Sequence, residues 1–442
     1  MLIEIETLLE ARWVIPVDPA TTVLNDHAIA IDNGIIKGIL PISEVSSHFK
    51  PRQTITLNDH ALIPGLINLH THAAMSLMRG LADDLPLMEW LNKHIWPTEA
   101  QHVNTQFVAD GTLLACAEMI KGGITCFNDM YFFPEACVQA TLKAGMRAAI
   151  GMIVIDFPTT YASDADDYLA KGLALRDQYH PHPLLSFCFA PHAPYTVNDR
   201  TFSNILTYAE QIDAPIHIHL HETQDEINMS IAANSKRPIE RLEQLGLLGP
   251  NLIAVHMVHL TDHEIKLMHQ YGCSIAHCPS SNMKLASGFA PIPSLLDQGI
   301  NVGMGTDSAA SNNRLDMFEE MRLTALLAKA VSGEANTLPA HQALEMATLN
   351  GAKALGLGNT TGSLTTGKAA DITAIDFSGL NLSPCYDPIS HLVYTAGREQ
   401  VSHVWVNGRM LLQDKQLTTL DTFELQNRAA YWQERIDATE KQ

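Results

Sequence analysis

Short stretches of alternating apolar and polar residues occupy both ends of the chain, a pattern that predicts β-strands. At the beginning, IEIETLLEARWVIPVD is followed by HAIAIDNGIIKGIL, in which Asp-Asn-Gly is a turn signal. Near the end, DITAIDF and SHVWVNGRMLLQ repeat the pattern, with Asn-Gly as a hairpin turn. We therefore expect a small composite β-sandwich domain formed by residues 1–60 and 369–442. Within it, residues 421–440 are expected to form a polar closing helix.

The middle of the chain, residues 61–368, alternates short apolar runs with stretches long enough for helices. The eight predicted strands span residues 61–72, 123–132, 147–155, 184–195, 215–222, 251–260, 272–282 and 301–310. Eight such units over roughly 300 residues are typical of a (β/α)₈ TIM-type barrel. A doubly wound open sheet is the alternative, but the GxGxxG turn that would favour it is absent. We therefore predict an α/β fold in which this barrel is the catalytic domain.

Polar residues gather where the predicted barrel strands end, which is the side on which barrels build active sites. These residues are His70, His72, Asp129, His192, His219, Glu222, His256, His277 and Asp307. One histidine at such a position means little. Several strands that end in this way indicate one shared site.

Strand periodicity places His70 and His72 on a common face of their strand. In PIHIHLHE the histidines at 217, 219 and 221 likewise share a face, which we expect to point into the barrel. Asp307 follows two glycines that leave space beneath a ligand. Three neutral imidazoles and one carboxylate suit a borderline divalent cation, Zn²⁺ above all.

Structural roles could explain the same residues. His70 and His72 could be core residues whose ring nitrogens are hydrogen-bonded within the fold. Asp307 could cap a helix beginning at SAASNNRLD. At most one or two of the three histidines in PIHIHLHE can contact a metal. A second metal would usually need a bridging carboxylated Lys or Glu at a strand end. The predicted fourth strand, LLSFCFAPHAPY, contains neither, which favours one metal per chain.

Composition and charge narrow the class of protein. Of 442 residues 46% are hydrophobic and 17% charged, too apolar for a disordered chain. Asp and Glu outnumber Lys and Arg by 48 to 28, and this balance disfavours nucleic-acid polymers and anionic membrane surfaces. No apolar run approaches the ~20 residues of a membrane helix. The seven cysteines contain no CxxC pair, and the acidic start lacks a signal pattern, so we expect a cytoplasmic protein with reduced thiols.

Several segments together resemble a known family. PGLINLHTHAAMSLMRG, HIHLHET, AVHMVHL and GTDSAASNN look like the amidohydrolase superfamily, and more narrowly its 5-methylthioadenosine/S-adenosylhomocysteine deaminases. LMRGLADDLPLMEWL, APHAPY and HCPSSNMKLASG make the resemblance specific. It covers nearly the whole chain, including the composite β domain.

The resemblance implies a metal site with four ligands. These would be His70, His72, His219 and Asp307, holding one Zn²⁺ per chain, although the same ligands could hold Fe²⁺, Mn²⁺ or Co²⁺. The H-x-x-E spacing selects His219 among its neighbours, because Glu222 lies three residues further on.

The resemblance also implies hydrolytic deamination at C6 of an adenine ring, with release of ammonia. Asp307 and His256 would take the proton of the attacking water, and Glu222 would protonate ring N1. Glu99 and His192 match positions used around the ribose. Trp90 lies in the EWL sequence shortly before Glu99. It would contact the substrate or simply pack under a loop.

The expected substrate is a small-molecule nucleoside, and its 5′ group can be ranked. S-adenosylhomocysteine carries a carboxylate that would want an Arg fork, yet residues 149–164 contain no Arg or Lys. Met152, Ile153, Phe157 and Pro158 in this segment suit an apolar methylthio group better. We therefore rank 5′-methylthioadenosine, then adenosine, above S-adenosylhomocysteine. A distant cation such as Arg79 would weaken this ranking.

Other readings stay open at this point. The same scaffold hosts guanine and cytosine deaminases and triazine hydrolases, which fold alone does not separate. A catalytically silent binding protein is disfavoured because Glu222, His256 and Asp307 are all present. A binuclear ring hydrolase of the hydantoinase type lacks its bridging ligand here. Related barrels often associate, so we expect a homo-oligomer, a dimer in the simplest case.

Overall fold

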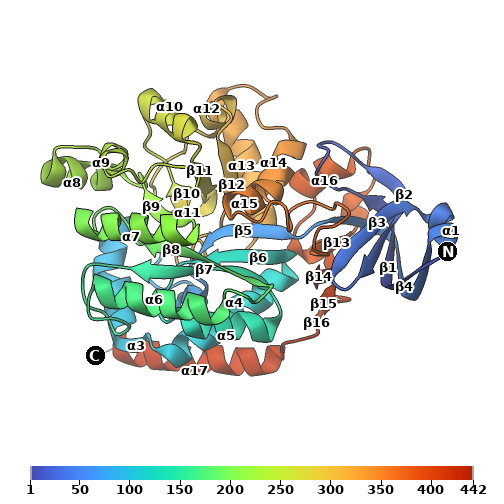
Figure 1. Cartoon of the computed structure of the whole chain (residues 1–442), viewed down its shortest axis with the longest axis horizontal. Helices are drawn as coiled ribbons and strands as arrows, with labels where there is room; N and C mark the ends of the chain where they lie inside the picture. The colour runs from blue at the N-terminus through green and yellow to red at the C-terminus, as the bar shows by residue number, and fades with distance from the viewer. Residues whose placement is uncertain (1, 441–442) are drawn as a thin grey trace.

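The computed structural model describes residues 2–440 and contains two eight-stranded sheets (Figure 1). The first sheet is parallel, and its strands follow one another in sequence order from β5 to β12. Its strands are β5 (Leu66–Thr71), β6 (Ile124–Asp129), β7 (Arg147–Val154), β8 (Leu185–Pro191), β9 (Ile216–Leu220), β10 (Leu252–His256), β11 (Ser274–His277) and β12 (Asn301–Met304). Each of them lies in one of the eight predicted segments.

Nearly all residues of these strands are buried on both faces of the sheet, as is typical of parallel sheets covered by helices. The first and last strands meet beyond β12, where the Asp307 N–H donates to the carbonyl oxygen of His70 over 3.0 Å. The predicted TIM-type barrel is therefore confirmed. Its carboxyl ends bring residues distant in sequence to one rim.

Helices alternate with the strands and cover the barrel. Those between and after the strands are α4 (Thr105–Lys121), α5 (Pro134–Ala144), α6 (Ala165–Tyr179), α7 (Asp199–Ile212), α8 (Gln224–Asn234), α9 (Pro238–Gln244), α10 (Asp262–Tyr271), α11 (Pro279–Lys284), α12 (Ile292–Asp297), α13 (Met317–Ser332), α14 (Ala340–Met346) and α15 (Leu349–Ala354). Shorter or terminal helices are α1 (Val45–His48), α2 (Leu87–Trp90), α3 (Trp96–His102), α16 (Pro388–Tyr394) and α17 (Thr422–Glu440).

The second sheet takes its strands from both ends of the chain, as the sequence predicts. Its order is β16-β15-β14-β13-β4-β1-β2-β3, so β4 joins the two halves by pairing with β1 and β13. The strands are β1 (Ile3–Val14), β2 (Leu24–Asp32), β3 (Ile35–Pro41), β4 (Phe49–Pro64), β13 (Ile372–Asp376), β14 (Val401–Val406), β15 (Arg409–Gln413) and β16 (Gln416–Leu417).

Both predicted turns of this sheet have the left-handed backbone that two-residue hairpins need. Asn33 and Gly34 have φ of 51° and 74°, and Asn407 and Gly408 have φ of 48° and 74°. Asn and Gly tolerate positive φ better than other residues, which explains the signal in the sequence.

A buried ion pair fixes the second sheet to the barrel. Arg147, at the start of β7, donates through Nε to Oδ2 of Asp371 over 2.8 Å. The other carboxylate oxygen of Asp371 accepts the Asn407 N–H, so one carboxylate ties a barrel strand to the β14–β15 turn. At the far end of the chain, α17 runs along the barrel, where the Trp432 indole donates to Asp110 of α4 (Figure 1).

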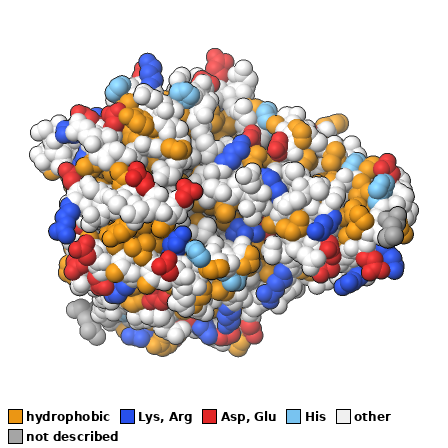
Figure 2. Space-filling model, viewed as in Figure 1, with side chains coloured by type: hydrophobic (Ala, Val, Ile, Leu, Met, Phe, Trp, Pro, Cys, Tyr) orange, Lys and Arg blue, Asp and Glu red, His pale blue; other side chains and the backbone are white. Residues whose placement is uncertain are grey.

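Figure 2 shows acidic and basic side chains interspersed on one face of the molecule, with no single broad basic patch on that face. The cysteines within the described part of the chain are free thiols, and all but Cys385 are buried. Within residues 2–440, no helix is both long and apolar enough to cross a lipid bilayer.

Candidate metal and active site

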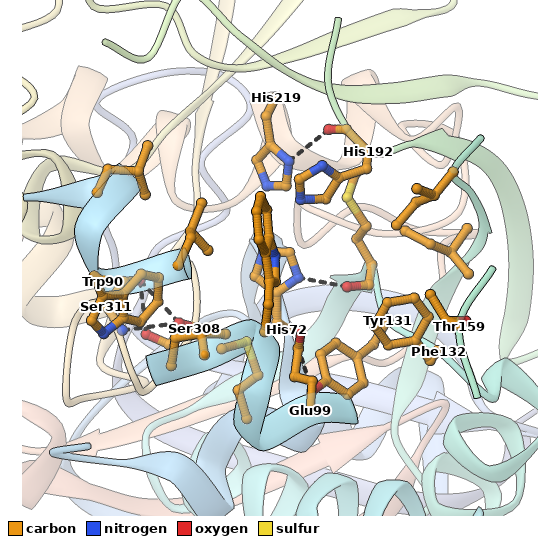
Figure 3. Close-up of a pocket in the computed structure, with 18 of the residues that line it drawn as sticks. His72, Trp90, Glu99, Tyr131, Phe132, Thr159, His192, His219, Ser308 and Ser311 are labelled. Atoms are coloured by element: carbon orange, nitrogen blue, oxygen red, sulfur yellow. Dashed lines mark hydrogen bonds between the residues drawn. The ribbon is translucent and has the colours of Figure 1, made fainter. Parts of the chain in front are cut away.

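A cavity of about 550 Å³ opens at the carboxyl ends of the barrel strands (Figure 3). Most of its lining is apolar, with polar side chains among it. Of the candidate metal, catalytic and ribose-binding residues predicted from the sequence, those that line it are His72, Trp90, Glu99, His192, His219, Glu222, His256 and Asp307. His70 lies beside them without exposure to solvent.

Three histidines turn the same ring atom toward one point, because each has its Nδ1 engaged elsewhere. Nδ1 of His72 lies 2.5 Å from the carbonyl oxygen of Met130, and Nδ1 of His219 lies 2.7 Å from that of His192. A carbonyl only accepts, so these two Nδ1 atoms carry the proton and the neutral ring leaves Nε2 with a lone pair.

His70 is the third histidine of this cluster. Its Nδ1 lies 3.0 Å from Nε2 of His217, and its own Nε2 lies 3.2 Å from Nε2 of His219. Burial lowers the pKa of His70 to about 4 and lowers that of His219 well below its usual range. Both imidazoles are therefore neutral at physiological pH.

The carboxylate of Asp307 closes the cluster. Its Oδ1 lies 3.2 Å from Nε2 of His70 and 3.3 Å from Nε2 of His72. Ligands at the usual zinc distances in a tetrahedron are separated by about 3.3 Å. Neutral nitrogen lone pairs and a carboxylate oxygen this close repel unless a cation or protons lie between them. The donor set therefore fits a divalent metal.

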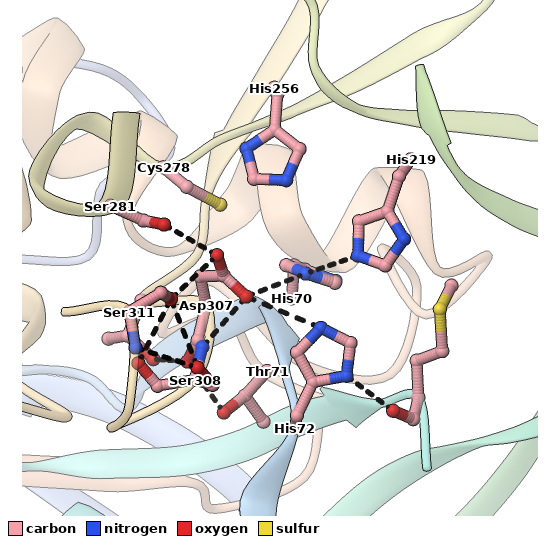
Figure 4. Close-up of polar contacts among 12 residues, drawn as sticks. His70, Thr71, His72, His219, His256, Cys278, Ser281, Asp307, Ser308 and Ser311 are labelled. Carbon is pink, nitrogen blue, oxygen red and sulfur yellow. Dashed lines mark hydrogen bonds and ion pairs between the residues drawn. The ribbon is translucent and has the colours of Figure 1, made fainter. Parts of the chain in front are cut away.

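Asp307 is oriented by a dense set of hydrogen bonds (Figure 4). Oδ2 accepts from the hydroxyls of Ser281, at 2.6 Å, and Ser311, at 2.9 Å, while Oδ1 accepts the Ser308 N–H at 2.7 Å. The three hydrogen bonds that the carboxylate accepts stabilise its ionised form, which burial alone would disfavour. The aspartate is thus ionised. It does not cap a helix, because Asp316 is the N-cap of α13.

Glu222 and His256 face each other beside this cluster. Oε2 of Glu222 lies 3.7 Å from Nε2 of His256, and the Ser287 hydroxyl approaches Oε1 at 3.5 Å. Burial raises the pKa of Glu222, which favours its protonated form. Nδ1 of His256 lies 2.8 Å from Oδ1 of Asn282 in α11.

A second polar group adjoins the histidine cluster, with the Tyr131 ring 6.4 Å from that of His72 and the His192 ring 5.0 Å from that of His219. The Tyr131 hydroxyl donates to Glu99 over 2.7 Å, and burial raises the pKa of Glu99 to about 7 (Figure 3). His192 holds its ring against Thr196, with Nδ1 3.1 Å from the hydroxyl. Trp90 presents its ring to the cavity while its indole N–H approaches the carbonyl of Leu81 at 3.4 Å.

The histidines of PIHIHLHE do not all share one environment. His217 and His219 lie in the cluster, but β9 ends at Leu220 and His221 has φ of 55°. Its Nδ1 pairs with the carbonyl of His259, and its Nε2 accepts the Ile239 N–H. The expected inward alternation therefore stops one residue before His221, which holds the loops after β9 and β10 instead.

No sequence motif or spacing points to some of the residues that build the site. Met130 and His192 act through backbone carbonyls, which any residue could supply. Glu226 accepts the N–H groups of His221 and Glu222, and Asn282 meets His256. Glu226 and Asn282 could have been found only as polar residues in the turns that follow barrel strands.

Comparison with known proteins agrees with this architecture. Residues 61–411 match the Amidohydrolase family. A 5-methylthioadenosine/S-adenosylhomocysteine deaminase of Saccharophagus degradans is 49% identical over 98% of this chain and 97% of its own. The corresponding protein of Teredinibacter turnerae is 48% identical over 98% of each chain.

Solved structures extend the comparison. An adenosine deaminase from Xanthomonas campestris, solved with bound zinc, superposes with a TM-score of 0.98 at 47% identity, over 99% of this chain and 100% of its own. An atrazine chlorohydrolase from Arthrobacter aurescens, complexed with zinc, gives a TM-score of 0.89 at 25% identity, over 96% of this chain and 99% of its own. The chain belongs to the amidohydrolase family and, within it, to the family of 5-methylthioadenosine/S-adenosylhomocysteine deaminases.

Proposed function

We propose that this protein is a zinc-dependent hydrolytic deaminase that replaces the 6-amino group of an adenosine derivative with oxygen and releases ammonia. His70, His72, His219 and Asp307 would hold one Zn²⁺ per chain. The observation that carries the proposal is the convergence of their donor atoms, 3.2–3.3 Å apart, beside Glu222 and His256 in a cavity of nucleoside size. Its relatives and its zinc-bound structural neighbour support the same assignment.

The residues around the donor set supply the proton transfers. A zinc ion in such a site acts as a Lewis acid that lets water ionise near neutral pH. Asp307 and His256 accept the proton of the attacking water and hold its oxygen toward C6. Glu222 donates a proton to ring N1, so that negative charge does not build up on the purine, and its raised pKa suits this role. The proton taken from the water is then passed to the amine, which leaves C6 as ammonia, and the C6 hydroxyl returns a proton to Glu222 as the carbonyl forms.

Residues that adjoin the metal ligands would bind the sugar. Glu99 and His192 line the cavity within reach of a ribose, and Tyr131 fixes the Glu99 carboxyl by donating to it. Trp90 contributes an aromatic face to the same cavity. A carboxylate suits two neighbouring hydroxyls because each hydroxyl can donate to it.

The lining also favours a neutral 5′ group. Within the described chain, no Lys or Arg lines this cavity, while Ile153, Phe157 and Pro158 do. Met152 is buried and does not line it. Arg79 is paired with Glu118, outside the cavity. A homocysteine carboxylate would therefore enter without a cationic partner, whereas a methylthio group would meet apolar surface.

A substrate panel tests both statements. Ammonia release should be measured with 5′-methylthioadenosine, adenosine, S-adenosylhomocysteine, guanine, cytosine and an aminotriazine. We expect turnover of the adenosine derivatives, with the largest kcat/KM for 5′-methylthioadenosine. A preference for guanine, cytosine or the triazine would overturn the proposed reaction. A preference for S-adenosylhomocysteine would overturn only the assignment of the 5′ group.

A further inference from the structure

The segment HCPSSN, after β11, is not explained by the proposed chemistry, although it is one of the most distinctive motifs of the chain. It runs from His277, the last residue of β11, into the first turn of α11 at the rim of the barrel. Two neighbouring side chains of this turn, Ser281 and Asn282, are 0% and 1% exposed. Both reach residues that the proposed reaction uses.

Asn282 fixes the hydrogen-bonding state of His256. Its amide oxygen lies 2.8 Å from Nδ1 of the imidazole, and an amide oxygen only accepts. The proton of the neutral ring is therefore on Nδ1, and Nε2 keeps its lone pair on the side of Glu222, 3.7 Å away. Without this contact the ring could place its proton on Nε2, where it could no longer accept one.

Ser281 acts on the carboxylate in a similar way. Its hydroxyl donates to Oδ2 of Asp307 over 2.6 Å, and Ser311 donates to the same oxygen (Figure 4). Because Oδ2 is occupied, the remaining oxygen faces His70 and His72. Ser311 duplicates this contact, whereas Asn282 provides the only described hydrogen bond to Nδ1 of His256.

The turn is itself held in place from several sides. The Asn282 N–H donates to the carbonyl of Cys278 over 3.0 Å, and its carbonyl accepts the Ser287 N–H over 2.8 Å. Ser280 donates its N–H to Glu320 of α13 over 3.1 Å. A buried and anchored turn can therefore hold both of its functional side chains at fixed angles.

We propose that Asn282 is a positioning residue that sets the tautomer and ring orientation of His256, and that Ser281 supports the Asp307 carboxylate from the same helical turn. The first turn of α11 would thus align both groups that accept the proton of the attacking water. This inference rests on the proposed function, since the roles of His256 and Asp307 come from it.

The test compares three variants with wild type. Asn282→Leu keeps the approximate volume and removes the acceptor, and Asn282→Asp restores an acceptor. Asn301→Leu removes a half-buried amide contact at the opposite end of the barrel. For Asn282→Leu we expect kcat to fall about 10- to 100-fold, with KM and zinc content near wild type. Asn282→Asp should recover most of the lost kcat, and Asn301→Leu should leave it unchanged.

A spectroscopic measurement makes the test independent of turnover. Nitrogen-15 NMR of the histidine rings, with His256 assigned by comparison with His256→Gln, reports which nitrogen carries the proton. We expect Nδ1–H in wild type and a changed tautomer in Asn282→Leu. An unchanged tautomer, or equal kcat in Asn282→Leu and Asn282→Asp, would overturn the inference. If wild type deaminates no nucleoside, the proposed function fails, and the tautomer of His256 still decides the role of Asn282.

Discussion

Neutral nitrogens and a carboxylate oxygen are held 3.2–3.3 Å apart at the centre of the site, an arrangement that is costly without a positive charge among them. The contacts that hold this arrangement join residues distant in sequence. Nδ1 of His72 donates to the carbonyl oxygen of Met130, and Nδ1 of His219 donates to that of His192. Loss of one ring should therefore weaken metal binding directly, without opening the fold.

His70→Ala should lose bound zinc, because it removes the ring that lies against both His219 and Asp307. Metal analysis of the purified variant measures this. His269→Ala, which removes an exposed histidine of α10, is the matched control and should keep wild-type zinc. Stoichiometric zinc in His70→Ala would mean that the assigned ligand set is wrong.

Glu222→Gln should keep its zinc and lose most turnover, by at least about 100-fold in kcat, because the amide cannot donate the proton that ring N1 needs. Steady-state kinetics of the zinc-loaded variant measure the effect, with the exposed Glu240→Gln as control. A kcat near that of wild type would contradict the role of Glu222.

At this scale the sequence predicts residue types and spacings well and orientations poorly. The H-x-H and H-x-x-E spacings lead to side chains that do meet in space, because strand alternation is a strong constraint. Strand alternation does not apply to His221, because the backbone turns to positive φ directly after β9 ends. The contact between Asn282 and His256 depends on the angle of a short helix, which no local pattern encodes.

At the scale of elements, the eight barrel strands are predictable because each is a short apolar run buried on both faces. The hairpin turns are predictable from Asn-Gly. Strand ends are less so: β4 continues through residue 64, beyond the expected end of the first β segment, and β16 is too short to leave a pattern. The division at residues 60 and 368 stays a prediction.

The junction of α11 and α13 carries a prediction about pH. Glu320 of α13 accepts the Ser280 N–H and an Asn312 amide, and burial raises its pKa from 4.5 to about 8. The folded state thus holds this proton more tightly than the unfolded chain. Its contribution to stability is fully present below a pH of about 4.5 and is lost as the pH rises to about 8.

Glu320→Gln should therefore lose less stability than wild type as the pH rises through this window, by about 1.4 kcal/mol per pH unit at most. Thermal unfolding at a series of pH values measures the slope, with exposed Glu334→Gln as control. Parallel curves for wild type and Glu320→Gln would contradict the raised pKa.

At the scale of the whole molecule, the barrel and the composite sheet are held together by a pair that the sequence does not reveal. Arg147 and Asp371 are 224 residues apart in the chain, and each has a side chain at most 4% exposed. Removing one partner leaves a buried charge, which is more costly than the pair itself is favourable.

Arg147→Met should destabilise the protein by about 3–5 kcal/mol, because the Asp371 carboxylate loses its ionic partner inside the protein. Denaturant unfolding measures the change. Lys50→Met breaks an exposed pair with Glu4 in the same sheet and should leave the free energy of unfolding nearly unchanged. Equal effects of the two variants would show that the buried pair does not join the two parts of the molecule.

The most direct test of the account is turnover of 5′-methylthioadenosine by zinc-loaded, chelator-stripped and zinc-reloaded protein, with ammonia and metal measured in the same samples. We predict turnover in the loaded protein, its loss on stripping and its return with one zinc per chain. Deamination that persists after the metal is removed, or loaded protein that deaminates no adenosine derivative, would contradict the assignment of the histidine and aspartate cluster as the site of a nucleoside deaminase.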